Sequence, residues 1–351
     1  APDPVGPDPV QYVLFAASGR AKAADWAPPP HPHVTLRSVP LSDEWLARIW
    51  HRLRLPIPIE WVTGPVDVLY SPDFVLPPTR RGVRLLLTVH DLSFVHYPDH
   101  FVPKLVRYLN RAVPQSVARA DLVLADSAAT QRDLVAHMGA PPSKVQVLYS
   151  GVSGRFCPEA EPGERERLRA RYGVGARPYV LSVGTVQPRK NYARLIEAFV
   201  RSGLGVAQDG VDLVIAGGRG WLYHDVLEAA DRHSESVRIL GFVEDADLPA
   251  LYRQAATFAF PSLYEGFGLP VLEAMACGVP VVCSNVSSLP EVAGAAAMQV
   301  DPLDVDGLAA ALARLNEDAE LRQDLAARGR EQAAKFTWQS AARQLLNAFT
   351  A

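Results

Sequence analysis

Short apolar runs alternate with amphipathic segments of helical length along the whole chain. In the first half, the apolar runs predict buried strands at residues 11–16, 33–37, 67–70, 84–89, 120–125 and 144–148. In the second half, the same pattern predicts strands at 179–183, 212–216, 237–243, 255–260 and 279–283. Helices are predicted between and after them, among them 42–54, 101–119 (interrupted at Pro114), 269–277, 318–335 and 338–350. This alternation is typical of an α/β protein built on parallel, doubly wound sheets.

The most informative stretch joins the strands predicted at 255–260 and 279–283. Gly266 and Gly268 open a tight loop, and Pro270 suits the first turn of the following helix because its missing N–H is not needed there. Gly278 ends that helix. A glycine-rich loop that leads from a strand into a helix directs free N–H groups at one point, so this segment predicts an anion site.

Two carboxylates accompany these amide groups. Glu265 lies in the loop and Glu273 lies inside the helix, so both are expected to face the same small space. A carboxylate only accepts hydrogen bonds, which suits it to the hydroxyl donors of a sugar. An ordinary helix start, where the dipole favours Glu, would explain Glu273 but not Glu265 together with the glycines. Amides for phosphate and carboxylates for hydroxyls therefore predict a nucleotide-sugar pocket.

A second strand, glycine turn and helix start covers residues 179–200. Arg189 and Lys190 add two cations there, the first with a fork for phosphate oxygens and the second with a compact point charge. The alternative is a basic pair that only faces solvent. Since a glycine turn after a buried strand is a poor place for such a pair, we predict that both side chains bind phosphate.

A histidine follows the strand predicted at 84–89. His90 and Asp91 lie at the carboxyl end of that strand, which is the usual ligand edge of an open α/β sheet. The alternative is a packed or capping histidine. The stretch from Asp301 to Asp306 resembles an aspartate-rich metal motif, but we expect Asp306 to cap a helix at 307–315 and expect no metal site.

Composition narrows the function classes. A chain of 351 residues fits two domains, and a net charge of −3 gives no sign of general nucleic-acid binding. Three scattered cysteines are too few for a disulfide framework or a metal cluster, so a reducing, cytoplasmic location is expected. The sequence contains no apolar run long enough to span a membrane.

The helix predicted at 42–54 mixes aromatic and basic residues. It resembles an interfacial helix, which predicts peripheral contact with the inner face of a membrane. The alternative is a helix that buries its tryptophans and exposes its arginines. The apolar members are Trp45, Ile49, Trp50 and Leu53, and the basic ones are Arg48, Arg52 and Arg54.

The segments Glu265-Gly-Phe-Gly-Leu-Pro270 and Glu273-Ala-Met-Ala-Cys-Gly-Val-Pro280 resemble a known family. They are similar to the E-x7-E element of the retaining family-4 glycosyltransferases, and the chain as a whole resembles bacterial mannosyltransferases of that family. The resemblance implies the GT-B fold, with two Rossmann-like, doubly wound parallel-sheet domains that face a cleft. The domains implied are an acceptor-side domain at 1–155, a nucleotide-sugar-binding domain at 156–335, and a last helix at 336–351 that packs back on the first domain.

The resemblance also implies roles for individual residues. Glu265 would hold hydroxyls of the donor sugar, Glu273 the ribose diol, and His90 would face the sugar. Arg189 and Lys190 would hold the diphosphate. Further donor contacts would come mainly from backbone groups, at Gly184, Phe242 (near the base), Gly266, Phe267, Gly268 and Leu269.

The implied reaction is retaining transfer of a sugar to an acceptor hydroxyl. The donor would be a nucleoside diphosphate sugar, with GDP-mannose favoured over a UDP-sugar, and the acceptor a sugar or a lipid-linked sugar in polysaccharide or glycolipid assembly. No cofactor and no metal ion would be required, because side-chain cations hold the diphosphate. Two alternatives remain, a non-catalytic sugar-nucleotide-binding subunit and another GT-B enzyme such as a sugar-nucleotide epimerase.

Two features depart from the family pattern. Ser150 and Ser153 stand in a turn where the family usually has Asn and Asp. Only ten residues rich in Pro and Asp precede Gln11, where the family has a strand, a glycine-rich loop and a helix. We therefore expect that roughly the first 35–45 residues of the family pattern, the length of a βα unit, are missing. A vacant position is then expected in the first sheet, beside the strands that end at Ala16 and Val89.

Overall fold

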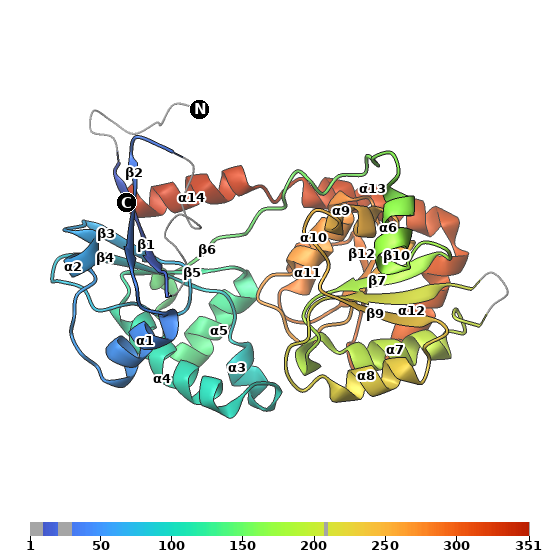
Figure 1. Ribbon diagram of the computed structural model, residues 1–351, viewed down its shortest axis with the longest axis horizontal. Coiled ribbons are helices and arrows are strands. Elements are labelled where there is room, and N and C mark those ends of the chain that lie inside the picture. Colours follow the sequence, from blue (N-terminus) through green and yellow to red (C-terminus); the bar gives the residue numbers. More distant parts are fainter. Residues whose placement is uncertain (1–9, 20–29, 207–209, 351) are drawn as a thin grey trace. The chain divides into compact units, whose positions relative to one another are not determined.

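A computed structural model of the protein describes residues 10–19, 30–206 and 210–350 (Figure 1). Contacts within the chain divide it into two compact units. The first comprises Ala1–Leu87 with Arg111–Val123, and the second comprises Thr88–Asn110 with Leu124–Ala351. These bounds come from contacts alone, and the predicted functional division near residue 155 remains a prediction.

The first unit begins with a small sheet of its own. Its two strands, β1 (Tyr12–Ala17) and β2 (Val34–Val39), pair in parallel. A four-stranded sheet has the order β3-β4-β5-β6, formed by β3 (Val68–Ser71), β4 (Arg84–Val89), β5 (Leu122–Ala125) and β6 (Val145–Val147). Because β4 lies between β3 and β5, the vacancy expected beside the strand that ends at Val89 is wrong. Within the described residues β1 pairs with β2 alone, and residues 1–9 and 20–29 lie outside the description.

The helices of this part are short apart from one. They are α1 (Asp43–Ala47), a π-helical turn (Arg48–Arg52), α2 (Glu60–Thr63) and the long α4 (Pro103–Arg119), which runs from the second unit into the first. The interruption expected at Pro114 is wrong, because α4 continues through it. A proline removes one backbone donor from a helix, and the buried Val113, Ser116 and Val117 around it supply the packing that maintains the helix.

The second unit is built on a six-stranded parallel sheet of order β12-β11-β10-β7-β8-β9. The strands are β7 (Tyr179–Val183), β8 (Asp212–Ala216), β9 (Val237–Gly241), β10 (Thr257–Phe260), β11 (Val281–Ser284) and β12 (Ala297–Val300). The chain starts in the middle at β7, builds outward through β8 and β9, and then returns to the other side of β7 with β10. The order therefore reverses between β7 and β10, which is the point where open α/β sheets bind ligands.

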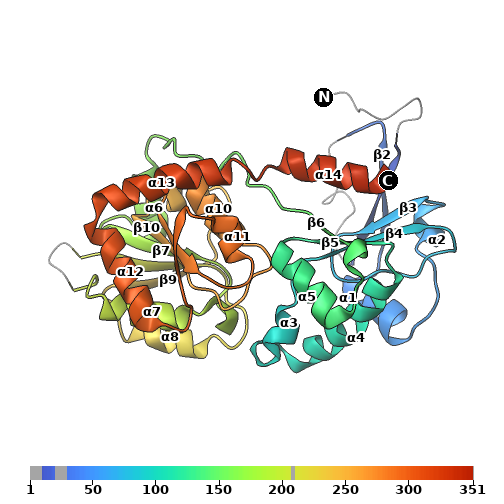
Figure 2. The same cartoon turned by 180° about the vertical axis from the view of Figure 1, so that it is seen from behind.

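Helices cover both faces of this sheet (Figures 1 and 2). On one face, α7 (Tyr192–Arg201), α8 (His224–Asp231) and α12 (Val305–Glu317) pack on strand residues such as Val180 and Leu213. On the other face, α9 (Leu248–Arg253), α10 (Leu269–Ala276) and α11 (Leu289–Ala293) pack on their neighbours Leu181 and Val214. Successive residues of one strand thus enter opposite cores, as the period of two requires.

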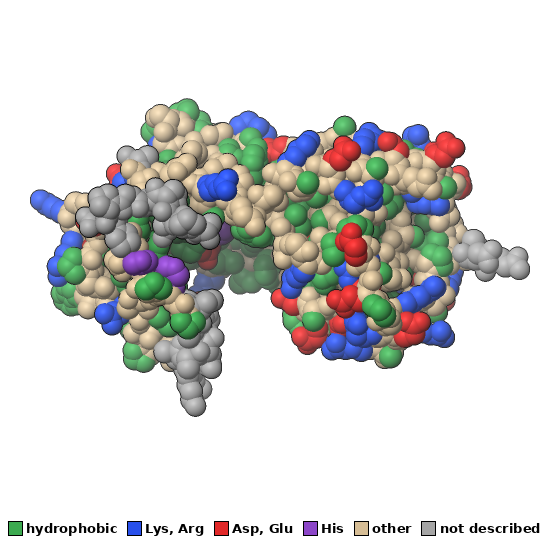
Figure 3. All heavy atoms as spheres, turned by 90° about the horizontal axis from the view of Figure 1, so that it is seen from above, with side chains coloured by type: hydrophobic (Ala, Val, Ile, Leu, Met, Phe, Trp, Pro, Cys, Tyr) green, Lys and Arg blue, Asp and Glu red, His purple; other side chains and the backbone are tan. Residues whose placement is uncertain are grey.

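The second unit contains further helices. They are α3 (Ser93–His96), α5 (Ala128–Met138), α6 (Glu164–Tyr172), α13 (Ala319–Ala333), α14 (Trp338–Thr350) and three-residue 3-10 turns at Pro98–His100, Pro142–Lys144 and Pro188–Lys190. On the face shown in Figure 3, acidic and basic side chains are interspersed over the second unit. None of the described helices is both long enough and apolar enough to cross a membrane.

The cap expected for α12 is shifted by two residues. Asp304, not Asp306, precedes the helix, and its carboxylate accepts a hydrogen bond of 2.9 Å from the amide of Gly307. Asp306 instead lies in the first turn and pairs with Arg201 at 2.6 Å. Asp304 has the extended backbone that a capping residue requires, whereas Asp306 is already helical.

Candidate functional site

The loop after β7 presents two cations at the reversal point of the sheet. Gly184 follows the strand with φ of +152°, and a side chain there would approach the Lys190 side chain and the Tyr192 hydroxyl at 3.1 Å. A glycine therefore leaves room for Lys190. The 3-10 turn Pro188–Lys190 then directs Arg189 and Lys190 to the edge of the sheet, and left-handed Asn191 starts α7.

The loop after β10 lies directly against the first loop. The Leu263 amide donates to the Arg189 carbonyl at 2.9 Å, and the Asn191 side chain donates to the Pro261 carbonyl at 3.0 Å. These bonds exist because β7 and β10 are hydrogen-bonded neighbours in the sheet. The loop continues through Glu265 into α10, with Pro270 in the first turn as predicted.

The three predicted charged residues form one buried cluster. The guanidinium of Arg189 lies 2.8 Å from one carboxylate oxygen of Glu265, and the ammonium of Lys190 lies 2.6 Å from the other. The three side chains are between 10% and 12% exposed. The Lys190 ammonium also lies 4.7 Å from the centre of the Phe260 ring, in cation–π contact. The cluster carries one net positive charge when all three groups are ionised.

Burial and charge act on this cluster in opposite directions. Burial alone would raise the pKa of Glu265, but the charges of Lys190 and Arg189 outweigh it and lower that pKa to about 2. Burial lowers the pKa of Lys190 despite the opposing charge of Glu265. For Arg189, burial would lower the pKa, but the carboxylates of Glu265 and Asp91 raise it overall. Glu265 is therefore an anion at neutral pH.

His90 lies next to the glycine-rich loop. A side chain at Gly266 would lie only 2.1 Å from the His90 carbonyl oxygen, so this close approach of two backbones requires glycine. The imidazole Nδ1 lies 2.8 Å from the carboxylate of Asp126, which orients the ring. The Thr130 hydroxyl donates to the His90 carbonyl at 3.2 Å. With its side chain 45% exposed, His90 is not the packed histidine of the alternative interpretation.

The loop after β10 is held by contacts of its carbonyl groups, whereas several of its amides have no acceptor among the described residues. Ser288 fixes this loop, because its hydroxyl lies within hydrogen-bond distance of two loop carbonyls, Glu265 at 2.9 Å and Phe267 at 2.6 Å. The Phe267 ring is buried and stacks 6.0 Å from Tyr149. The four amide groups that follow Glu265 donate no hydrogen bond to any other described residue: Gly266, Phe267, Gly268 and Leu269. Amides without an internal acceptor at a helix start are available to an anion.

Glu273 has different surroundings from those expected. It lies in α10, but its carboxylate accepts a hydrogen bond of 2.8 Å from the Tyr252 hydroxyl on α9. Burial raises the pKa of Glu273, and the Tyr252 bond opposes that rise. The cations Arg189 and Lys190 pair with Glu265 and not with Glu273. Phe242 follows β9 and is 70% exposed. The contact with the base that is expected there involves its backbone.

Two models of known protein families match this chain, one in each half. The family model described as Glycosyltransferase Family 4 matches residues 9–153, and the model described as Glycosyl transferases group 1 matches residues 164–332. The chain is 36% identical over 284 residues to O-antigen chain mannosyltransferase B from Escherichia coli, covering 80% of this chain and 74% of that protein. The chain belongs to the group 1 and family 4 glycosyltransferases.

Other relatives of this glycosyltransferase agree. It is 31% identical over 247 residues to the serotype-specific mannosyltransferase WbdA of Escherichia coli, covering 69% of this chain but only 30% of that longer protein. Among solved structures, Anabaena HepE in complex with UDP superposes with a TM-score of 0.69 at 19% identity, covering 97% of this chain and 100% of that one. The predicted GT-B fold, with two α/β domains built on parallel sheets, is thereby confirmed.

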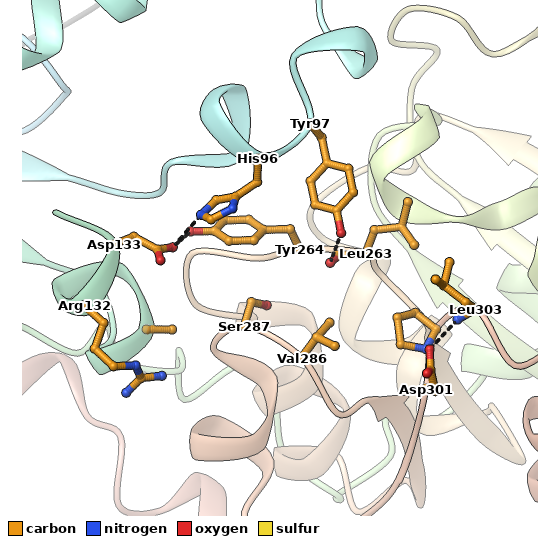
Figure 4. Close-up of a pocket in the computed structure, with 12 residues that line it drawn as sticks. His96, Tyr97, Arg132, Asp133, Leu263, Tyr264, Val286, Ser287, Asp301 and Leu303 are labelled. Atoms are coloured by element: carbon orange, nitrogen blue, oxygen red, sulfur yellow. Dashed lines mark hydrogen bonds and ion pairs between the residues drawn. The ribbon is translucent and has the colours of Figure 1, made fainter. Parts of the chain in front are cut away.

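An open cavity of about 590 Å³ in the glycosyltransferase is lined by Leu263 and Tyr264, the two residues that precede Glu265 (Figure 4). Tyr264, next to Glu265, forms one wall, and its hydroxyl donates to Asp133 at 2.5 Å. Tyr97 reaches across to the Leu263 carbonyl at 3.3 Å. The polar lining residues are His96, Tyr97, Arg132, Asp133, Tyr264, Ser287 and Asp301. Ser287 also accepts the Glu265 amide at 3.0 Å and has a left-handed backbone.

Sequence reasoning missed several of these contact residues. A polar cluster after a parallel strand is a usable signal, and it would have indicated Ser287 and Ser288 after the strand predicted at 279–283. Asp126 follows the strand predicted at 120–125 in the same way. Tyr252 lies inside α9 and has no sequence signal of its own.

Proposed function

We propose that this glycosyltransferase moves mannose from GDP-mannose to an acceptor hydroxyl with retention at the anomeric carbon, in polysaccharide assembly. The observation that supports it best is the buried Arg189–Glu265–Lys190 cluster, within a chain 36% identical to a protein named O-antigen chain mannosyltransferase B. A site for a diphosphate sugar must meet negative phosphate and polar hydroxyls side by side. The cluster offers cations and a carboxylate within hydrogen-bond distance of one another.

Arg189 and Lys190 are proposed to bind the diphosphate. Their charges are only half balanced by Glu265, so a diphosphate that enters completes the compensation of a largely buried charge. The free amides from Gly266 to Leu269 add neutral donors at the same edge of the sheet. Both groups stabilise the charge that grows on the leaving phosphate as the sugar departs.

Glu265 is proposed to change partners when the donor binds. Both its oxygens are held by the two cations in this structure. As phosphate oxygens take over those cations, the carboxylate becomes available to accept hydrogen bonds from sugar hydroxyls. While it pairs with the two cations, its pKa is about 2, so the side chain is a carboxylate when the donor arrives. We infer no covalent glycosyl intermediate on Glu265, so retention is proposed to proceed by attack from the side of the leaving group.

Glu273 and His90 are proposed to bind the two ends of the donor. Tyr252 orients the Glu273 carboxylate, whose role is to accept the ribose hydroxyls, while the backbone near Phe242 meets the base. Asp126 orients the His90 ring, which is exposed enough to reach the sugar. Positioning of the donor and acceptor would then supply much of the rate enhancement.

Metal independence forms part of the same proposal. A divalent ion can neutralise the charge on a leaving diphosphate, and here Arg189 and Lys190 are proposed to do so. Membrane contact is proposed for the first unit, on a smaller surface than the sequence indicated. Trp45 is 54% exposed, whereas Trp50 is half-buried and its indole N–H donates to the Ile57 carbonyl at 3.0 Å. Trp45 and the exposed Leu53 therefore carry that part of the proposal.

The donor is tested by calorimetry and turnover with GDP, UDP, GDP-mannose and UDP-glucose. We expect GDP and GDP-mannose to bind more tightly than the uridine compounds, and mannose to be transferred with the α or β configuration of the donor retained. UDP and UDP-glucose are included because the solved HepE structure is a complex with UDP. If UDP-glucose binds tightly and its glucose is transferred, the proposed base and sugar are wrong, but the proposed class of reaction still holds. Inversion of configuration, or binding without any transfer or hydrolysis, would refute the proposal.

A further inference from the structure

Two histidines and an aspartate converge on one wall of the cavity. Asp133 and His137 lie one turn apart on α5, so they share a face of that helix, and His96 ends the short helix α3. The Nε2 atom of His96 lies 3.0 Å from the Asp133 carboxylate. The His96 and His137 rings meet edge to face with centres 4.9 Å apart. One potential ligand atom from each of the three residues lies within 4.8 Å of the other two.

These side chains form a ligand set for a borderline transition metal. Zn²⁺ in proteins is bound by imidazole nitrogen and carboxylate oxygen at about 2.0–2.2 Å, so ligand atoms of one site lie a few ångströms apart. Hard ions such as Mg²⁺ or Ca²⁺ prefer oxygen alone and would not favour two imidazoles. With three protein ligands, at least one coordination position remains for water or another ligand.

The neighbouring Tyr264 strengthens this assignment. Its hydroxyl donates to the Asp133 carboxylate at 2.5 Å, and its ring stacks on His96 with centres 4.9 Å apart (Figure 4). Hydrogen bonds to a ligating carboxylate fix its orientation and are typical of metal sites. The side chains of His96 and Asp133 are 29% and 20% exposed and line the cavity, so an ion can reach them from solvent.

We propose that His96, Asp133 and His137 bind one Zn²⁺ ion, with an open coordination position at the metal. The site is separate from the Arg189–Glu265–Lys190 cluster, so the proposal does not depend on the proposed function. It is also compatible with transfer that needs no metal at the diphosphate. The competing explanation is an ordinary ion pair between His96 and Asp133, in which His137 is only a neighbour.

The His137→Ala variant separates these two explanations. It removes one ligand but leaves the His96–Asp133 contact and the Tyr264–Asp133 hydrogen bond in place. His137 is exposed, so the metal-free variant is expected to keep the melting temperature of the parent. Asp133→Asn is the second variant, since it keeps the shape of the carboxylate and removes its charge. His224→Ala is the matched control, because His224 is an exposed helical histidine outside the cluster.

Zn²⁺ affinity is measured on tag-free, metal-stripped protein by competition with a chromophoric chelator, and geometry by the visible spectrum of the Co²⁺ form. We expect one ion per chain, intense tetrahedral-type Co²⁺ bands, and a loss of affinity of about tenfold or more in His137→Ala and Asp133→Asn, comparable with the effect of disturbing known sites. His224→Ala should match the parent. The proposal is overturned if the parent binds no better than His137→Ala, or if the control loses affinity equally.

Discussion

The Glu265→Gln substitution tests the charged cluster most directly. It keeps the shape of the side chain but leaves Arg189 and Lys190 without their shared carboxylate. Removing one partner of a buried ion pair costs about 3–5 kcal/mol, because the remaining charge is uncompensated. Lys190 can relieve part of this cost by losing its proton, since burial already lowers its pKa. We therefore expect about 3 kcal/mol, which corresponds to a fall of at least about 6 °C in melting temperature for a unit of this size.

Nucleotide binding should respond in the opposite direction. Phosphate oxygens can replace the missing carboxylate, so GDP should restore most of the lost melting temperature and bind to Glu265→Gln at least as tightly as to the parent. Turnover should still fall, because the sugar loses a charged acceptor. One hydrogen bond to a charged group contributes about 1.5–3 kcal/mol, which corresponds to about a 10- to 150-fold loss of kcat/KM.

The matched control is Glu197→Gln. Glu197 also pairs with an arginine, Arg201 at 2.5 Å, but it is half exposed, so the change should cost less than about 1 kcal/mol. Melting curves with and without GDP, calorimetry, and initial rates are measured on all three proteins. The reasoning is refuted if Glu265→Gln melts like the control. It is equally refuted if Glu265→Gln binds GDP more weakly than the parent does.

The remaining predictions concern the same groups. Arg189→Ala or Lys190→Ala should weaken nucleotide binding by about 1.5–3 kcal/mol in calorimetry. Glu273→Gln should weaken the binding of free nucleotide and of sugar nucleotide alike. If only the binding of the sugar nucleotide is weakened, the assignment of Glu273 to the ribose is contradicted. The folded pKa of Glu265 lies below its ordinary value of 4.5, so its stabilisation is present above pH 4.5 and is lost as pH falls towards about 2. Melting temperatures between pH 5 and pH 3, roughly that window, should therefore fall more steeply for the parent than for Glu265→Gln, and parallel curves would count against the assignment. EDTA should leave transfer unchanged, and restoration of lost activity by manganese would contradict metal independence. Trp45→Ala should reduce sedimentation with anionic liposomes, and an unchanged bound fraction would exclude that contact.

The sequence by itself determined the elements and the motifs. The apolar runs located nearly every strand of the three sheets, because a parallel strand buried on both faces must be apolar on both faces. Local chemistry also located Pro270 in the first turn of α10. Each of these features depends only on residues within a few positions in the chain.

Local pattern was less reliable where several residues could play one role. Asp301, Asp304 and Asp306 all precede or begin α12, and the backbone at each position decided that Asp304 is the cap. The half-exposed strand β12 was missed, since it lacks the continuous apolar run of its neighbours. The two tryptophans of the segment at 42–54 differ in exposure because the π-helical turn and the Ile57 carbonyl together hold Trp50 inward.

Only the tertiary structure decided which side chains meet. Lys190 and Glu265 are 75 positions apart, and three complete strands, β8, β9 and β10, lie between their loops in sequence. They touch because the sheet order places β10 beside β7, a choice made by packing of the whole sheet rather than by either loop. Separate roles for phosphate and sugar could be predicted from residue type. That the two cations pair with this one carboxylate follows from strand order, which no local pattern encodes.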